Sequence, residues 1–155
     1  MKQLAIMAAA IIGLGTSSAL ATQISCTISS FTYSENGESV TLTGEELKKF
    51  SGVPSNCLTG NVTYGNGLWT PQTGSKSCNE KFGLGGQNFS TSPTKYRERS
   101  GKLHLKQKYK IEDNIGTIRF SGKGTYDTRT KVYQHSLVGK ASGEKVKIST
   151  VMHCK

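Results

Sequence analysis

Acidic residues, proline and apolar residues are all scarce in this 155-residue sequence. It contains ten Asp and Glu against 20 Lys and Arg, only three Pro, and 34% hydrophobic residues. Without the first 21 residues the apolar fraction falls to about 29%. These shortages exclude a large multidomain enzyme, a polytopic membrane protein and an acidic disordered tail. They leave a small basic globule of formal charge +10 with a thin core.

The sequence has one apolar run of note, and it lies at the start. Lys2 precedes an apolar stretch from Leu4 to Gly15, and Ala19-Leu20-Ala21 then places small residues where a signal peptidase reads them. A run of about 12 apolar residues is too short to cross a bilayer. We therefore expect a signal peptide over 1–21 and a single secreted β domain over 22–155. The domain is expected to be extracellular, or periplasmic in a bacterium, and not membrane-spanning.

Cysteine is also rare, with four residues at Cys26, Cys57, Cys78 and Cys154. An even number in an exported chain with a small core indicates disulfides. A metal site needs closely spaced ligand pairs, which these cysteines lack, so we expect no metal and no cofactor. Three pairings are open. We favour Cys26 with Cys154, which joins the ends of the mature chain, and Cys57 with Cys78, which closes a loop.

The first half of the domain has one hairpin signal and one helix signal. Asn36-Gly37 separates a β-rich stretch over 24–33 from a second one around Val40 and Leu42. Thr43 followed by Glu46 is a capping box, which predicts a two-turn helix over 44–51. Residues 51–93 are expected to be mostly loop, with short strands at 61–64, 68–70 and 82–84.

The second half is patterned as strands. Residues 102–111 alternate strictly between Lys or His and residues such as Leu103 and Leu105. Further strands follow around 118–126, 131–138 and 145–154, and Gly122 with Gly124 suggests a bulge or bend in the first of these. The predicted fold is all-β. It is a small antiparallel β-barrel or two-sheet sandwich of seven to nine strands, with a C-terminal four-strand meander, one short helix and two disulfides.

The positive charge is concentrated in the meander. Residues 95–155 carry a net charge of about +10, whereas 22–94 carry about −1. The alternation predicts one cationic strand face that attracts anions, and the last strand is expected to contribute to it. The other reading is a solvated face whose lysines protect an edge strand. The candidate anion-binding residues are Lys102, His104, Lys106, Lys108, Lys110, Lys145 and Lys147.

Two alternative functions start from other residues. A secreted ribonuclease-like toxin would use a His/Glu acid–base pair and a cation for the phosphate, from His104, His135, Glu112 and Arg119. A carrier of small apolar ligands would use the scattered aromatic residues of the first half to line a barrel mouth, although such residues more often form a core. Those aromatic residues are Tyr64, Trp69, Phe82, Phe89 and Tyr96.

Two stretches resemble a known group of proteins. Ile28-Ser29-Ser30-Phe31, and Cys78 followed by the strand Leu103-His104-Leu105-Lys106-Gln107-Lys108, look like the small cysteine-bridged β-barrel proteins secreted by filamentous fungi. The placement of Cys57 and Cys154 departs from that pattern. The resemblance implies a secreted host-interaction protein without an enzymatic site.

The sequence holds no Gly-x-Ser-x-Gly, His-Glu-x-x-His or phosphate-loop motif. The leading interpretation is therefore a secreted, non-enzymatic binding protein, effector-like or virulence-associated. Its expected partner is a host or cell-surface component: a protein, a polysaccharide or an anionic lipid headgroup. Nucleic acid is a further candidate partner. Lys dominates the stripe, which favours diffuse electrostatics over base-specific readout.

Overall fold

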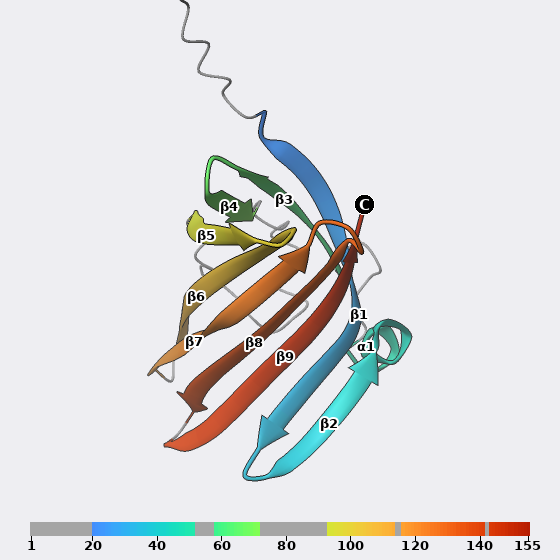
Figure 1. Ribbon diagram of the computed structural model, residues 1–155. Helices are drawn as coiled ribbons and strands as arrows, with labels where there is room; N and C mark the ends of the chain where they lie inside the picture. Colours follow the sequence, from blue (N-terminus) through green and yellow to red (C-terminus); the bar gives the residue numbers. More distant parts are fainter. Residues whose placement is uncertain (1–19, 52–57, 72–92, 114–115, 142) are drawn as a thin grey trace, which may run out of the picture.

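The computed structural model describes residues 20–51, 58–71, 93–113, 116–141 and 143–155, and within these the fold is all-β with one short helix (Figure 1). The predicted strand at 82–84, the Cys57–Cys78 bridge, Phe82, Phe89 and residues 1–19 of the predicted leader lie outside the described residues. The elements are β1 (Thr22–Glu35), β2 (Glu38–Thr43), α1 (Gly44–Ser51), β3 (Thr59–Gly65), β4 (Leu68–Pro71), β5 (Thr94–Arg99), β6 (Lys102–Asp113), β7 (Gly116–Asp127), β8 (Val132–Ala141) and β9 (Glu144–Cys154).

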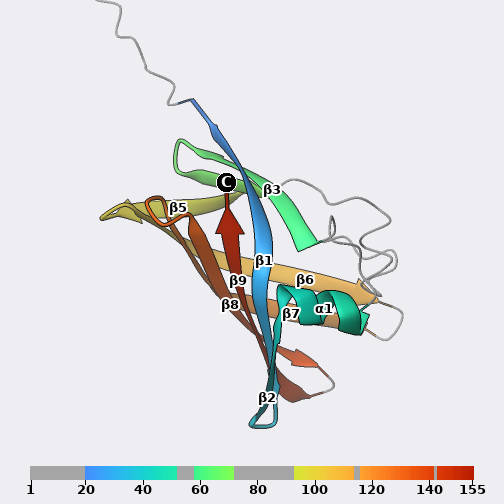
Figure 2. The same cartoon turned by 90° about the vertical axis from the view of Figure 1, so that its right-hand side faces the viewer.

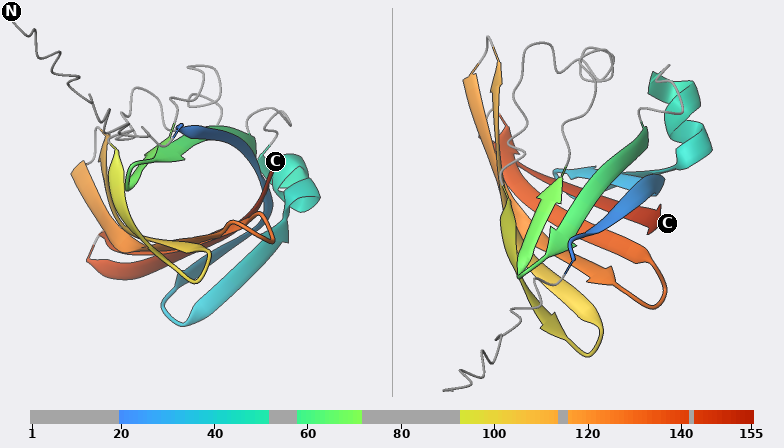
Figure 3. Two further views of the ribbon diagram at one scale, coloured as in Figure 1. Left: turned by 45° about the horizontal axis from the view of Figure 1, so that its top comes forward. Right: turned by 90° about the horizontal axis from the view of Figure 1, so that it is seen from above.

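Eight of the strands close into an antiparallel barrel. The order is β1-β3-β4-β5-β6-β7-β8-β9, and β9 pairs with β1 to complete the ring (Figure 3). The predicted choice between barrel and sandwich is thus settled as a barrel, and β6 to β9 form the predicted meander. β2 stands outside the ring, because it pairs with the second half of β1 while β3 pairs with the first half.

Local sequence signals explain the start of the chain. Asn36 and Gly37 both adopt positive φ values, 51° and 87°, as a two-residue hairpin turn between β1 and β2 requires. The capping box is formed in full, since Thr43 N donates to Glu46 Oε2 at 2.7 Å and Glu46 N donates to Thr43 Oγ1 at 3.3 Å. The helix over 44–51 is confirmed. Leu47 on this helix packs with Leu58. The helix lies beside β1 and β2 (Figure 2).

Aromatic side chains fill one end of the barrel. Trp69 is 1% exposed and Tyr126 is fully buried. The Trp69 ring lies 5.0 Å from Tyr133 and 5.5 Å from Tyr126, measured between centroids. The partly buried rings of Tyr64 and Tyr96 pack against this cluster. Tyr64, Trp69 and Tyr96 are therefore part of the core, which is the more ordinary of the two readings of these residues.

The Cys26–Cys154 disulfide forms across the seam of the barrel. The two residues are direct partners in the β1–β9 register, with Cα atoms 4.0 Å apart and an S–S bond of 2.04 Å. Both are buried in the core. The bridge therefore links the first strand to the last at the pairing that closes the ring.

Three expectations need correction. The β7 register runs without interruption past Gly122 and Gly124, so no bulge lies there. These glycines instead allow close packing, because a Cβ at Gly122 would lie 1.8 Å from the Ser136 carbonyl oxygen. The register shift is in β1, between Ile28 and Ser30.

The short strands predicted at 61–64 and 68–70 are confirmed as β3 and β4. They form a regular hairpin of the barrel wall, so the expectation of mostly loop was too broad for this part of 51–93. Finally, β5 was not predicted at all. Its residues, mostly charged, carry no apolar alternation, and pairing with β6 and β4 determines its conformation.

Candidate anion-binding face

The meander presents its cationic side chains on the outer face of the barrel wall. Along β6, residues such as Lys106 and Lys108 are exposed, whereas Leu103, Leu105 and Gln107 are buried. This alternation confirms the predicted strand. Exposed cationic residues lie beside it on β5, β7, β8 and β9. We call this set the basic face, and it comprises Lys95, Arg97, His104, Lys106, Lys108, Arg119, Lys123, Lys140, Lys145 and Lys147.

Like charges lie directly opposite one another on the basic face. Lys106 of β6 pairs with Lys123 of β7, and Lys140 of β8 pairs with Lys145 of β9. Side chains of directly opposed residues are about 4.5–5.5 Å apart at Cβ, and like charges there destabilise a sheet. The wall therefore brings cations together without local compensation at these two pairs.

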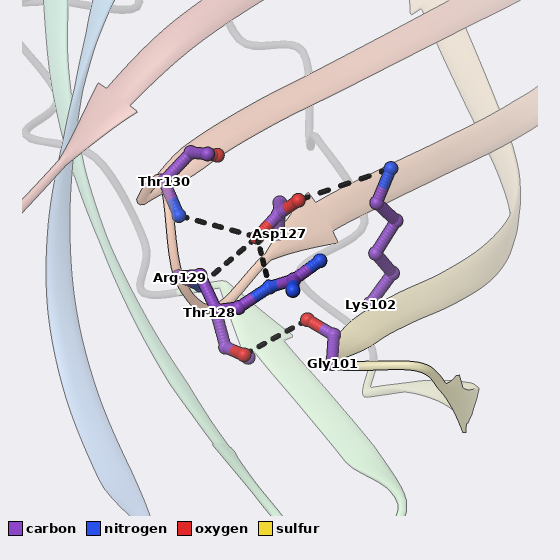
Figure 4. A network of polar contacts seen from close by, with 6 residues as sticks. All are labelled: Gly101, Lys102, Asp127, Thr128, Arg129 and Thr130. Atoms are coloured by element: carbon purple, nitrogen blue, oxygen red, sulfur yellow. Dashed lines mark hydrogen bonds and ion pairs between the residues drawn. The ribbon is translucent and has the colours of Figure 1, made fainter.

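Acidic residues are nearly missing from the same face. Among the outward positions of β5 to β9 whose side chains the structure describes, Asp127 is the one acidic residue, and it lies opposite Lys102. Its carboxylate accepts hydrogen bonds from the amides of Arg129 at 2.9 Å and Thr130 at 3.2 Å, as Figure 4 shows. These bonds, with the charges of Arg129 and Lys102, lower the pKa of Asp127. Lys102 Nζ lies 3.8 Å from Asp127 Oδ2, so Lys102 lies at the neutralised rim of the face.

Shallow hollows run across the basic face rather than along a single strand. One is lined by Lys95, Lys106, Lys108 and Lys123, and its neighbour by residues that include Arg97 and His104. A third continues from Lys123 toward Ser136 and Ser149 on β8 and β9. All three share Lys123. A separate hollow at the other end of the face is lined by Arg119, Lys140 and Lys145.

Only some of the predicted anion-binding residues lie close together on the basic face. His104, Lys106 and Lys108 lie together on the exposed side of β6. Lys147 lies further across the wall, opposite Val138 of β8 and Ser34 of β1. For Lys110 the structure describes the backbone, which pairs with Arg119. Sequence reasoning left Lys95, Arg97, Lys123 and Lys140 out of the site. Period-two alternation from Arg119 along the next predicted strand would have found Lys123.

The residues proposed for a nuclease do not come together. His104 pairs with Thr125, and His135 pairs with the preceding residue of β7, Gly124. Because successive residues of a strand face opposite sides, the two imidazoles lie on opposite faces of the barrel wall. Arg119 is exposed on the outer face, and Glu112 is described by its backbone, which pairs with Thr117.

His135 lies in the barrel interior instead. Its ring centroid is 5.6 Å from that of Tyr133 in an edge-on arrangement. Its Nδ1 is buried and has no hydrogen-bond partner among the described residues. Burial disfavours the charged imidazolium and lowers the pKa of His135 to about 4. This histidine is therefore neutral at physiological pH.

The described part of the chain contains no cluster of His, Cys, Asp and Glu with the geometry of a metal site. None of its helices is long and apolar enough to cross a bilayer. Comparison with models of known protein families gives no match, and comparison with curated proteins gives none either.

Proposed function

We propose that this chain is an exported, non-enzymatic binding protein that holds a polyanion of a host or cell surface on its basic face. The observation that carries the proposal is the Lys106–Lys123 pair, whose like charges are direct cross-strand neighbours. Such repulsion is relieved when a phosphate, sulfate or carboxylate group lies between the two ammonium groups. An anionic partner would therefore bind most strongly at this part of the wall.

Three further observations support the proposal. The hollows that meet at Lys123 give a partner a surface with several cations within reach. The Asp127 carboxylate accepts hydrogen bonds from the backbone of its own loop, so it does not neutralise the positive potential over Lys106 and Lys108. The predicted leader and the end-to-end disulfide fit a protein that acts in an oxidising compartment.

The test compares two variants of equal net charge on immobilised heparin. Lys106→Glu with Lys123→Glu reverses the central pair, whereas Lys49→Glu with Lys155→Glu reverses two exposed lysines outside the basic face. We expect the wild type to need the highest salt for elution, and the first variant to elute well before the second. Equal shifts for the two variants would show that overall charge governs retention and would reject the proposed site.

A further inference from the structure

The outer wall carries a row of side chains that changes from cations to hydroxyls. Lys106, Lys123 and Ser136 are successive cross-strand partners on β6, β7 and β8. Ser149 of β9 continues the row, followed by Thr32 of β1 and Thr41 of β2. Ser149 Oγ lies 3.2 Å from Ser136 Oγ, and the Thr32 and Thr41 hydroxyls lie 2.9 Å apart. This row of cross-strand neighbours, which we call the track, therefore offers ammonium groups at one end and hydroxyl groups at the other.

The hollows follow this track. The two cationic hollows lie over β5, β6 and β7, and the third, lined by Thr125, Gln134, Ser136 and Ser149, lies over β7, β8 and β9. Adjacent strands are about 4.8 Å apart, so the track from β5 to β9 is roughly 19 Å long. That length suits an extended chain molecule that crosses the strands, and Lys123 lies where the cationic and hydroxyl parts meet.

The side-chain types distinguish between the polyanions. Single-stranded nucleic acid binds on aromatic platforms that stack with its bases, and no described outward position of β5 to β9 carries Phe, Tyr or Trp. A lipid surface is bound with apolar side chains inserted among the headgroups, and the large apolar residues at those outward positions are three valines, Val132, Val138 and Val151. Lys ammonium groups act as compact point charges for single anionic groups, and Ser, Thr and Gln pair with neutral hydroxyls.

We infer that the basic face binds a linear acidic polysaccharide, whose sulfate or carboxylate groups contact Lys106 and Lys123 and whose sugar hydroxyls contact Gln134, Ser136 and Ser149. This inference rests on the proposed function, because it names the polyanion that the same face holds. Sugar chains of this kind carry both anionic groups and hydroxyls along one strand, so a single chain can contact the ammonium end and the hydroxyl end of the track together.

The experiment measures Kd for a heparin oligosaccharide and for a single-stranded RNA of similar charge, and measures partition onto vesicles containing phosphatidylserine. Ser136→Ala with Ser149→Ala removes two hydroxyls without changing charge. Its matched control is Thr27→Ala with Thr59→Ala, which removes another cross-strand hydroxyl pair, 2.9 Å apart, away from the basic face. Circular dichroism confirms that each variant is folded.

We expect the wild type to bind the oligosaccharide more tightly than RNA or vesicles. The Ser136/Ser149 variant should lose about 3–10-fold in affinity for the oligosaccharide and should bind RNA as the wild type does. The Thr27/Thr59 control should match the wild type on both. Tighter binding of RNA or vesicles, or an unchanged Kd for the serine variant, would overturn the polysaccharide assignment.

The proposed function fails by a different result. If Lys106→Glu with Lys123→Glu binds the oligosaccharide, the RNA and the vesicles as well as Lys49→Glu with Lys155→Glu does, then the basic face is not the binding surface at all. The other outcome is that the first variant loses affinity for all three partners while the wild type shows no preference for the oligosaccharide. That result would support the basic face as the binding surface and would reject the polysaccharide as its partner.

Discussion

Lys106 and Lys123 are direct cross-strand partners on β6 and β7, and both are exposed on the outer wall of the barrel. Four residues earlier on β6, Lys102 lies opposite Asp127, so a compensated pair and the repulsive Lys106–Lys123 pair lie close together on the same two strands. The free protein is thus less stable at the centre of the basic face than its sheet geometry would allow. The repulsion is lowered when an anion binds.

Lys123→Glu should stabilise the free protein while it weakens binding. The substitution turns a repulsive cross-strand pair with Lys106 into an attractive one, so the free energy of unfolding should rise by about 0.5–1 kcal/mol at low salt. Salt screens exposed charges, so the gain should shrink in 0.5 M NaCl. Urea unfolding at both salt concentrations measures the effect, and a loss of stability at low salt would contradict it.

Removing the Cys26–Cys154 bridge should destabilise the barrel strongly. The cysteines are 128 residues apart in sequence, and a bridge across so long a loop restricts the unfolded chain most. The chain-entropy relation gives about 4–5 kcal/mol for such a loop. Urea unfolding of the Cys26→Ser, Cys154→Ser double variant measures this loss, and the substitutions leave Cys57 and Cys78 unchanged. A loss below about 1 kcal/mol would show that strand pairing alone closes the ring.

His135 should make the fold sensitive to mild acid. Its pKa is about 4 in the folded protein, because burial disfavours the imidazolium, and about 6.5 when unfolded. As the pH falls below 6.5, the unfolded chain gains a proton that the folded protein does not. Stability is therefore lost on acidification, by about 2 kcal/mol between pH 7 and pH 5.

The measurement compares the unfolding free energy of the wild type and of His135→Gln at pH 7 and pH 5. The variant lacks the titrating imidazole, so its own loss between the two pH values should be smaller by about 2 kcal/mol. An equal loss in the two proteins would place the acid sensitivity elsewhere.

A methyl group at Gly122 should be poorly tolerated. Its Cβ would lie 1.8 Å from the Ser136 carbonyl oxygen and 2.9 Å from the Leu137 Cα, so the backbone of β8 would have to move. We expect Gly122→Ala to lose at least about 2 kcal/mol. Gly60→Ala is the matched control, because a Cβ there meets nothing within 4 Å and should change stability by less than about 1 kcal/mol. Thermal unfolding of both variants tests the contrast, which would be refuted by similar melting temperatures.

The sequence signals that predicted the structure correctly depend on interactions between residues close together in the sequence. The alternation along 102–111 determines which side of β6 is buried, the Asn36-Gly37 pair forms the first hairpin turn, and the Thr43–Glu46 box starts the helix. Each depends on residues within a few positions of one another. The Cys26–Cys154 pairing was also predicted, because a disulfide between the two ends of the domain stabilises a protein with a small core.

The features that were missed depend on contacts between distant residues. The choice between a barrel and a sandwich was left open, because it depends on the pairing of β1 with β9, which are far apart in the sequence. β5 is built largely from charged residues, and it is a strand because β6 and β4 provide its hydrogen bonds. For the same reason, only part of the candidate site could be predicted from the sequence. The exposed side of β6 was predictable, but Lys95 and Lys123 join it through strand pairing.

The most direct test of the account is the salt dependence of binding to a heparin oligosaccharide. Lys106→Gln with Lys123→Gln should lower the slope of log K against log salt by about two, because two fewer cations displace counterions. Lys49→Gln with Lys155→Gln removes the same charge outside the basic face and should leave the slope unchanged. A reduced slope in the first variant alone is the predicted result, and equal slopes in the two variants would contradict the central claim.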